Sequence, residues 1–194
     1  TKGLALNEQV RCRIIRVERA IRCNEPVHLL GEAVTDARRL AAKLGQPQLQ
    51  AQVLLLEGDI ARIGKRLEES REHYNAALGL LKGRTDTELR FRLVSRKGDL
   101  ALSHGRRKEA FDCFREAADG FRRFELPVRE GWALVRLARV SEQRLPLLRR
   151  ARERFCEADI AAGVAAVDAV SGEPGASLAW HLDRATSHAR ARHN

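Results

Sequence analysis

Apolar residues recur at spacings of three and four along most of the chain, and short polar breaks interrupt them. Between residues 10 and 23, for example, Val10, Ile14 and Val17 fall on one face of a helix. Glycine and proline occupy many of the breaks, where they favour the ends and beginnings of helices. The pattern predicts helices over residues 10–23, 26–44, 47–63, 67–81, 85–103, 107–124, 127–142, 146–157, 160–170 and 176–191.

One set of small and aromatic residues in this pattern repeats at a fixed distance. Gly58, Ser70, Tyr74 and Ala77 return 40 positions later as Gly98, Ala110, Phe114 and Ala117. A partial copy follows at Ala151, Phe155 and Ala158, and a weaker one comes first at Ala33, Ala37 and Leu40. A period of this length is typical of solenoids, in which each repeat packs only against its neighbours.

The absence of β-branched runs gives strands little support, so we expect an all-α fold. The sequence predicts a single domain over residues 1–194, with repeats at about 4–45, 47–83, 85–125 and 127–158. Terminal helices would occupy 159–192, and the last of them would cap the stack.

The repeated residues resemble the tetratricopeptide repeat, in which two antiparallel helices carry small, aromatic and small residues at set positions. The resemblance covers roughly residues 26 to 170, although the period of 40 exceeds the family's 34. It implies a right-handed α-solenoid of antiparallel hairpins with about 8–10 helices. Long-period repeats of this kind look like the sensor and scaffold regions of large bacterial regulators.

Packing explains the spacing that the two complete copies share. Gly58 and Gly98 would let the second helix of each hairpin approach closely, and Tyr74 and Phe114 would fill the space between hairpins. A ligand-stacking role for Tyr74 is the alternative.

The resemblance also implies that the first helix of each repeat lines a concave groove for a partner. Carrying the family's groove positions onto this chain gives Gln52, Leu55, Asp59, Arg62, Arg92, Ser95, Asp99, Trp132, Arg136 and Arg139. For the charged members the alternative is solvated helix surface with intrahelical ion pairs. The asparagine and lysine that some family members use to hold a terminal carboxylate are absent from these positions.

Charge suggests a competing function. The chain has 36 Lys and Arg against 26 Asp and Glu, a net charge of +10. Arginine clusters at 144–154 and 184–192 could bind the phosphates of a nucleic acid. The alternative is that the many arginines reflect a G+C-rich genome and have no binding role. Only 5% of residues are aromatic, and no nucleic-acid-binding motif accompanies the charge. The first expectation is therefore a protein or peptide partner, either a separate molecule or another domain of the same full-length protein.

Catalytic signatures are missing from the sequence: it has no P-loop, nucleophile elbow or zinc-protease motif. We expect no enzyme activity, no cofactor and no metal, and we interpret His181 and His188 as solvated surface. Cys12, Cys23, Cys113 and Cys156 lack metal-site spacing and are expected to be reduced thiols in or near the core.

The sequence has no run of apolar residues long enough for a membrane span and no signal-peptide pattern at its start. We therefore expect a cytoplasmic protein without membrane contacts. Because the chain begins at Thr1 and contains no methionine, we expect it to be part of a longer protein.

Overall fold

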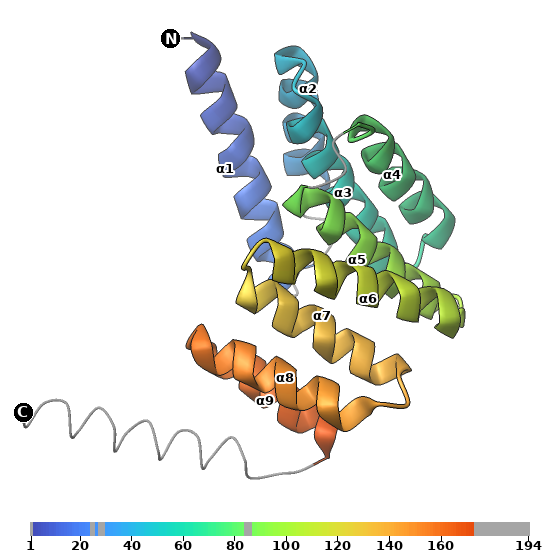
Figure 1. Cartoon of the computed structure of the whole chain (residues 1–194). Helices are drawn as coiled ribbons and strands as arrows, with labels where there is room; N and C mark the ends of the chain where they lie inside the picture. The colour runs from blue at the N-terminus through green and yellow to red at the C-terminus, as the bar shows by residue number, and fades with distance from the viewer. Residues whose placement is uncertain (1, 24–25, 27–29, 84–86, 173–194) are drawn as a thin grey trace, which may run out of the picture. The chain divides into compact units, whose positions relative to one another are not determined.

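The computed structural model describes residues 2–23, 26, 30–83 and 87–172, and all regular structure in these ranges is α-helical (Figure 1). The all-α prediction is confirmed for this part of the chain. The described helices are α1 (Lys2–Arg22), α2 (Gly31–Leu44), α3 (Pro47–Ile63), α4 (Leu67–Leu80), α5 (Glu88–Ser103), α6 (Arg107–Arg123), α7 (Pro127–Val140), α8 (Arg144–Glu157) and α9 (Ala161–Ser171).

Most of these bounds lie within about three residues of the predicted ones, because prolines and glycines mark the ends. Pro47 and Pro127 stand in the first turn of α3 and α7, and Gly45 ends α2 in the left-handed conformation with φ of 62°. Two starts were predicted wrongly. Helix α1 extends eight residues further upstream, from Val10 to Lys2, and α2 begins at Gly31 and not at Pro26. The predicted capping helix over 176–191 lies outside the described residues.

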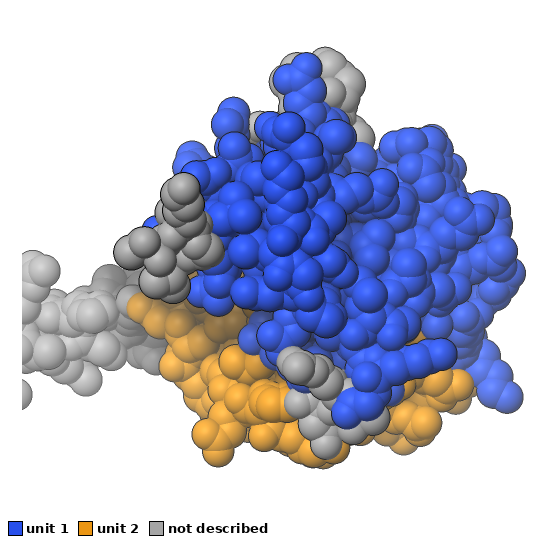
Figure 2. Space-filling model, turned by 90° about the horizontal axis from the view of Figure 1, so that it is seen from above, with its two compact units in different colours: residues 1–109 blue, residues 110–194 orange. Residues whose placement is uncertain are grey.

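The chain divides into two compact units, residues 1–109 and 110–194, which Figure 2 shows in different colours. The division falls inside α6, so no proline- or glycine-rich linker marks it. The single domain and the solenoid remain predictions, and each unit is described by itself.

Unit 1 is built around two apolar clusters that share helix α3. In the first, residues such as Val17 from α1 and Leu40 from α2 pack with Val53 from α3. In the second, Leu55 from α3 packs with Tyr74 from α4 and Leu93 from α5. Because α3 has buried residues on both sides, it joins the two clusters into one body.

The hairpin of α3 and α4 shows the close approach that the repeat predicts. A Cβ atom at Gly58 would lie 2.3 Å from Cε1 of Tyr74, so only glycine fits beneath the ring. The Ser70 hydroxyl donates to the Gly58 carbonyl oxygen at 2.8 Å. Tyr74 itself is fully buried between α3, α4 and α5, as expected for a core residue.

Unit 2 uses glycine and an aromatic ring in the same way. Gly131 of α7 and Gly163 of α9 both face the ring of Phe155 on α8, where an added Cβ would lie 2.7 and 2.3 Å from it. Trp132 meets the same ring edge to face, with centroids 5.1 Å apart. Phe155, the aromatic residue of the partial third copy, is therefore fully buried where α7, α8 and α9 pack together.

Candidate functional site

A groove of about 440 Å³ lies on unit 1 where α1 meets the first turns of α3 and α5. Its floor is apolar, since Ile14, Leu49 and Leu89 line it and are almost completely buried. Ile15 also lines the groove, but 60% of its surface is exposed. It follows Ile14 by one position, which turns it about 100° away from the buried face of the helix. An exposed branched side chain in a groove is a ready anchor for an apolar group of a partner.

Three glutamines form the side of the groove that α3 provides. Gln46 precedes the first turn of α3, and Gln48 and Gln52 lie four positions apart on one face of that helix. Each side-chain amide can both donate and accept hydrogen bonds. This side therefore suits a partner that presents unpaired polar groups of both kinds.

An ion pair joins two helices inside the groove. Arg92 of α5 donates a charge-assisted hydrogen bond to Glu18 of α1, which lies 74 positions earlier in the sequence. Both side chains are mostly shielded from water. The α5 start is fixed as well, because the Thr87 hydroxyl accepts from the backbone N–H of Arg90 at 3.2 Å. The groove is thus held in shape by contacts within unit 1.

Among the residues predicted to form a groove, Gln52 and Arg92 line this one. The prediction was wrong for Leu55 and Ser95, because both are buried, Leu55 in the cluster around Tyr74. Arg62 and Asp99 are half-buried and lie outside the groove lining.

The other predicted positions belong to unit 2. Trp132 packs against Phe155, Arg136 donates to the Trp132 carbonyl oxygen at 3.4 Å, and Arg139 is exposed on α7.

Asp59 was also predicted as a groove residue, and the structure places it in the core with only 4% exposed. Its carboxylate accepts from the Tyr74 hydroxyl at 2.7 Å and from Nε of Arg96 at 3.0 Å. Burial and this carboxylate raise the pKa of Tyr74 above its ordinary range. Burial alone would lower the pKa of Arg96, but Asp59 and Asp99 outweigh it and raise that pKa. The arrangement ties α3, α4 and α5 together and leaves Asp59 no role in the groove.

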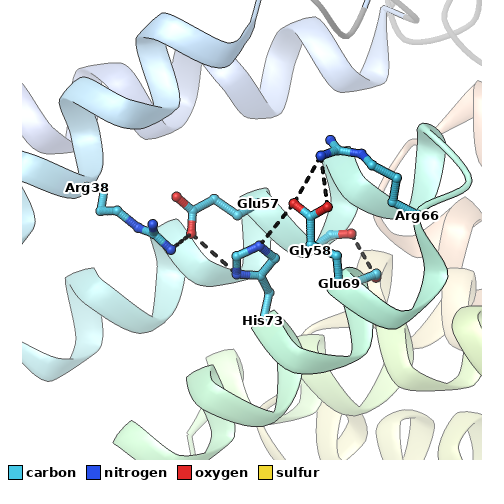
Figure 3. A network of polar contacts seen from close by, with 7 residues as sticks. Arg38, Glu57, Gly58, Arg66, Glu69 and His73 are labelled. Atoms are coloured by element: carbon cyan, nitrogen blue, oxygen red, sulfur yellow. Dashed lines mark hydrogen bonds and ion pairs between the residues drawn. The ribbon is translucent and has the colours of Figure 1, made fainter.

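A second polar network connects α2, α3 and α4 (Figure 3). Arg38 donates to Glu57 at 2.8 Å, and the ring of His73 lies 3.6 Å from Glu57 and 3.6 Å from Glu69. Arg66 binds the Glu69 carboxylate with both oxygens accepting. Burial raises the pKa of Glu57, although Arg38 and His73 oppose the shift. Among the described residues, no group of three or more histidine, cysteine or acidic side chains could hold a metal ion.

The arginines of α8, the basis of the nucleic-acid alternative, are partly used inside unit 2. Arg150 and Arg152 donate to the buried carboxylates of Glu130 and Asp168. Arg154 lies 3.7 Å from Glu130 and binds Glu157 at 2.7 Å. Arg144 and Arg149 are exposed, and the cluster at 184–192 lies outside the described residues.

Sequence reasoning missed the part of the groove that α1 contributes. Arg11, Ile15 and Glu18 were not considered, because the groove positions were counted from the repeats that begin near residues 47, 85 and 127 and not from the one before them. The adjacent apolar pair at positions 14 and 15 was the available signal, since the two side chains lie about 100° apart around the helix.

The cysteines also depart from expectation. All four are free thiols, but Cys12, Cys23 and Cys156 are exposed and only Cys113 is half-buried. The core prediction was therefore wrong for three of them. Cys12, for example, lies two positions after the buried Val10 and so points to the other side of the helix. His181 and His188 lie outside the described residues.

No protein-family model matches the chain, and no curated protein matches it in a sequence search. Its structure is similar to the crystal structure of BtubC (BKLC) from P. vanneervenii, with a TM-score of 0.56. The match covers 98% of this chain and 93% of that chain at 17% sequence identity. At this identity the likeness supports the all-helical fold and nothing more. Within the described ranges, no helix is both long and apolar enough to cross a membrane.

Proposed function

We propose that this chain is a protein-interaction module of tetratricopeptide type, which binds a peptide, a helix or a partner domain in the groove of unit 1. One observation carries the proposal. The groove is lined by α1, α3 and α5, the helices that open successive hairpins in the repeat scheme. Shared lining by first helices is what the resemblance implies for a partner-binding face.

The composition of the groove supports binding as its role. An apolar floor with an exposed isoleucine, surrounded by amide and charged groups, has the arrangement of a protein interface core and its rim. We propose that the module acts by binding alone, in the cytoplasm, as a scaffold or sensor part of a larger bacterial regulator. Its partner would be a separate protein or another domain of the same full-length chain.

Ile15 offers a clean way to test the proposal, because the chain contains a matched control. Leu145 at the start of α8 has the same 60% exposure as Ile15 but lies in unit 2, outside the groove lining. Replacing either residue by aspartate puts the same charge on an equally exposed helix surface. Arg92 is a poorer probe, since Arg92→Glu would set two carboxylates against each other at Glu18.

The experiment captures partners from the source cell with the full chain, after nuclease treatment and at two salt concentrations. We expect a protein partner that the wild type and Leu145→Asp retain and Ile15→Asp loses. Retention by all three chains would remove the groove as the binding surface. Recovery that depends on nucleic acid would favour the arginine alternative.

A further inference from the structure

Four arginines of α1 follow one another at every third position: Arg13, Arg16, Arg19 and Arg22. This row is called the arginine ladder below, and none of its first three members lines the groove. Helix α1 as a whole contains six lysine and arginine residues against two glutamates, and one of these, Glu18, is already bound by Arg92. The charge of α1 is therefore unbalanced, unlike that of the groove lining.

The two middle members of the ladder are exposed. The side chains of Arg16 and Arg19 form no ion pair with a described residue. No acidic residue stands three or four positions from either of them, although side chains at these spacings meet on a helix. Their neighbours in the ladder are arginines, and like charges at such spacings destabilise a helix. The ladder therefore does not stabilise α1.

Exposed arginines on α2 and α4 of the same unit are arranged differently. Arg39 binds Asp36 at 3.0 Å and Arg71 binds Glu68 at 2.5 Å, in each case across three positions. A G+C-rich genome would raise the arginine content of every helix, but it would not remove the carboxylates from beside one row of arginines. The ladder is therefore better explained by an anionic partner that α1 itself does not contain.

We propose that the arginine ladder binds the phosphates of double-stranded DNA, a function beyond the one proposed for the groove. A guanidinium group binds a phosphate through two parallel hydrogen bonds, so a row of arginines matches a row of phosphates. A protein partner would need several apolar anchors. Among the side chains of α1 that the structure describes, Ile15 is the one large apolar group that is exposed, and it belongs to the groove. Helix α1 also has no aromatic residue on which the bases of a single strand could stack.

The geometry of α1 favours a DNA duplex. Each step of three positions turns the side chain about 60° around the helix, so the ladder crosses the exposed face from one side to the other. Figure 1 shows α1 at the edge of unit 1, where no described helix of that unit covers its outer face. The major groove of B-form DNA admits an α-helix between two rows of phosphates, whereas that of duplex RNA is deep and narrow. Contacts to phosphates alone do not read the bases, so binding should not depend on sequence.

Fluorescence anisotropy of the full chain with a labelled DNA duplex tests the proposal. Arg16→Gln with Arg19→Gln is the test variant, and Arg39→Gln with Arg71→Gln is the control, since both remove two exposed positive charges from unit 1. We expect the test variant to bind about tenfold more weakly at low salt, and the slope of log affinity against log salt to fall by about two. The control should change both much less. Circular dichroism checks that each variant keeps its helices.

Thiol alkylation then locates the DNA on the chain. Cys12 lies four positions before Arg16 and Cys23 four positions after Arg19, and both thiols are exposed. Cys156 is exposed on α8, the helix that carries the other described arginine cluster. We expect bound DNA to slow the alkylation of Cys12 and Cys23 by iodoacetamide and to leave that of Cys156 unchanged. Mass spectrometry of the digested protein measures each rate.

Several results would overturn the inference. Equal weakening by the two double variants would mean that net charge and not the ladder attracts the DNA, and absence of binding at low salt would remove the function altogether. Protection of Cys156 in place of Cys12 and Cys23 would assign the binding to α8. Duplex RNA, polyglutamate or anionic vesicles that bind as tightly as the DNA would refute the choice of partner. The groove is tested separately, because Ile15→Asp reports on the cellular protein partner.

Discussion

Gly58 allows α3 and α4 to approach closely because glycine has no Cβ atom. The Tyr74 ring occupies the place where a Cβ would stand, and the ring is held there by its hydrogen bond to Asp59. The ring can retreat neither along that bond nor through the packed cluster around it. A side chain at position 58 therefore has to push backbone or core apart.

We expect Gly58→Ala to lower the free energy of unfolding by about 1–3 kcal/mol through overpacking. Gly79→Ala on α4 is the matched control, since an added Cβ there meets nothing within 4 Å. In that open helical position alanine should stabilise the protein by about 0.4–1 kcal/mol. Urea denaturation followed by circular dichroism measures both, and equal effects of the two changes would contradict the packing argument.

Asp59 shows why a residue's place in a repeat does not fix its role. The residue 40 positions after Asp59 is Asp99, which is the same residue type. The residue 40 positions after Tyr74 is Phe114, which has no hydroxyl to donate. Asp59 therefore has a buried donor that its repeat partner lacks, and Arg96 completes the contact from α5. The position equivalent to Arg96 in the preceding copy is Leu56. The repeat pattern therefore contained no signal for the hydrogen bond between Arg96 and Asp59.

At the scale of helices, α2, α3 and α4 are joined by a network in which one carboxylate is poorly hydrated. Glu57 is 12% exposed, and burial raises its pKa in spite of Arg38 and His73. The folded protein thus holds a proton on Glu57 more tightly than the unfolded chain, where the ordinary value is 4.5. Its contribution to stability is largest below that value and declines as pH rises through the higher pKa of the folded state.

Glu57→Gln removes this titration, so comparison with the wild type isolates it. We expect the wild type's free energy of unfolding, relative to that of Glu57→Gln, to fall as pH rises from about 4 and to level off above the pKa of folded Glu57. Arg38→Gln should shift the fall to higher pH, because the nearest opposing charge is gone. Denaturation curves over this pH range provide the measurement, and a difference that rises with pH would contradict the assignment.

For the whole molecule, local pattern was enough to predict the helices but not their long-range contacts. Periodicity, Pro47 and Gly45 located α2 and α3 because they act on neighbouring residues. The groove depends on α1 meeting the starts of α3 and α5, and the Arg92 contact with Glu18 spans 74 positions. Contacts at that separation depend on how helices pack, so only Gln52 and Arg92 of the predicted groove residues lie there.

The net charge of +10 belongs to the whole molecule, and its arginines can either stabilise the fold or bind an acidic partner. In unit 2, Arg152 neutralises Asp168, whose side chain is only 8% exposed. Part of the arginine content therefore stabilises the fold and is already neutralised by carboxylates. Arg149, by contrast, is exposed and does not pair with a buried carboxylate of the described residues. Substitution on α8 can separate the two roles, because both kinds of arginine occur on this one helix.

We expect Arg152→Gln to lower the free energy of unfolding by about 1–3 kcal/mol, because it leaves the buried Asp168 carboxylate without its cation. Arg149→Gln should stay within about 0.5 kcal/mol of the wild type. Urea denaturation measures stability, and oligonucleotide binding at several salt concentrations measures the competing role. If α8 served to bind phosphates, both changes would weaken that binding and reduce its salt dependence. A stable Arg152→Gln protein with weakened oligonucleotide binding would show that the charge of α8 serves recognition and not the fold.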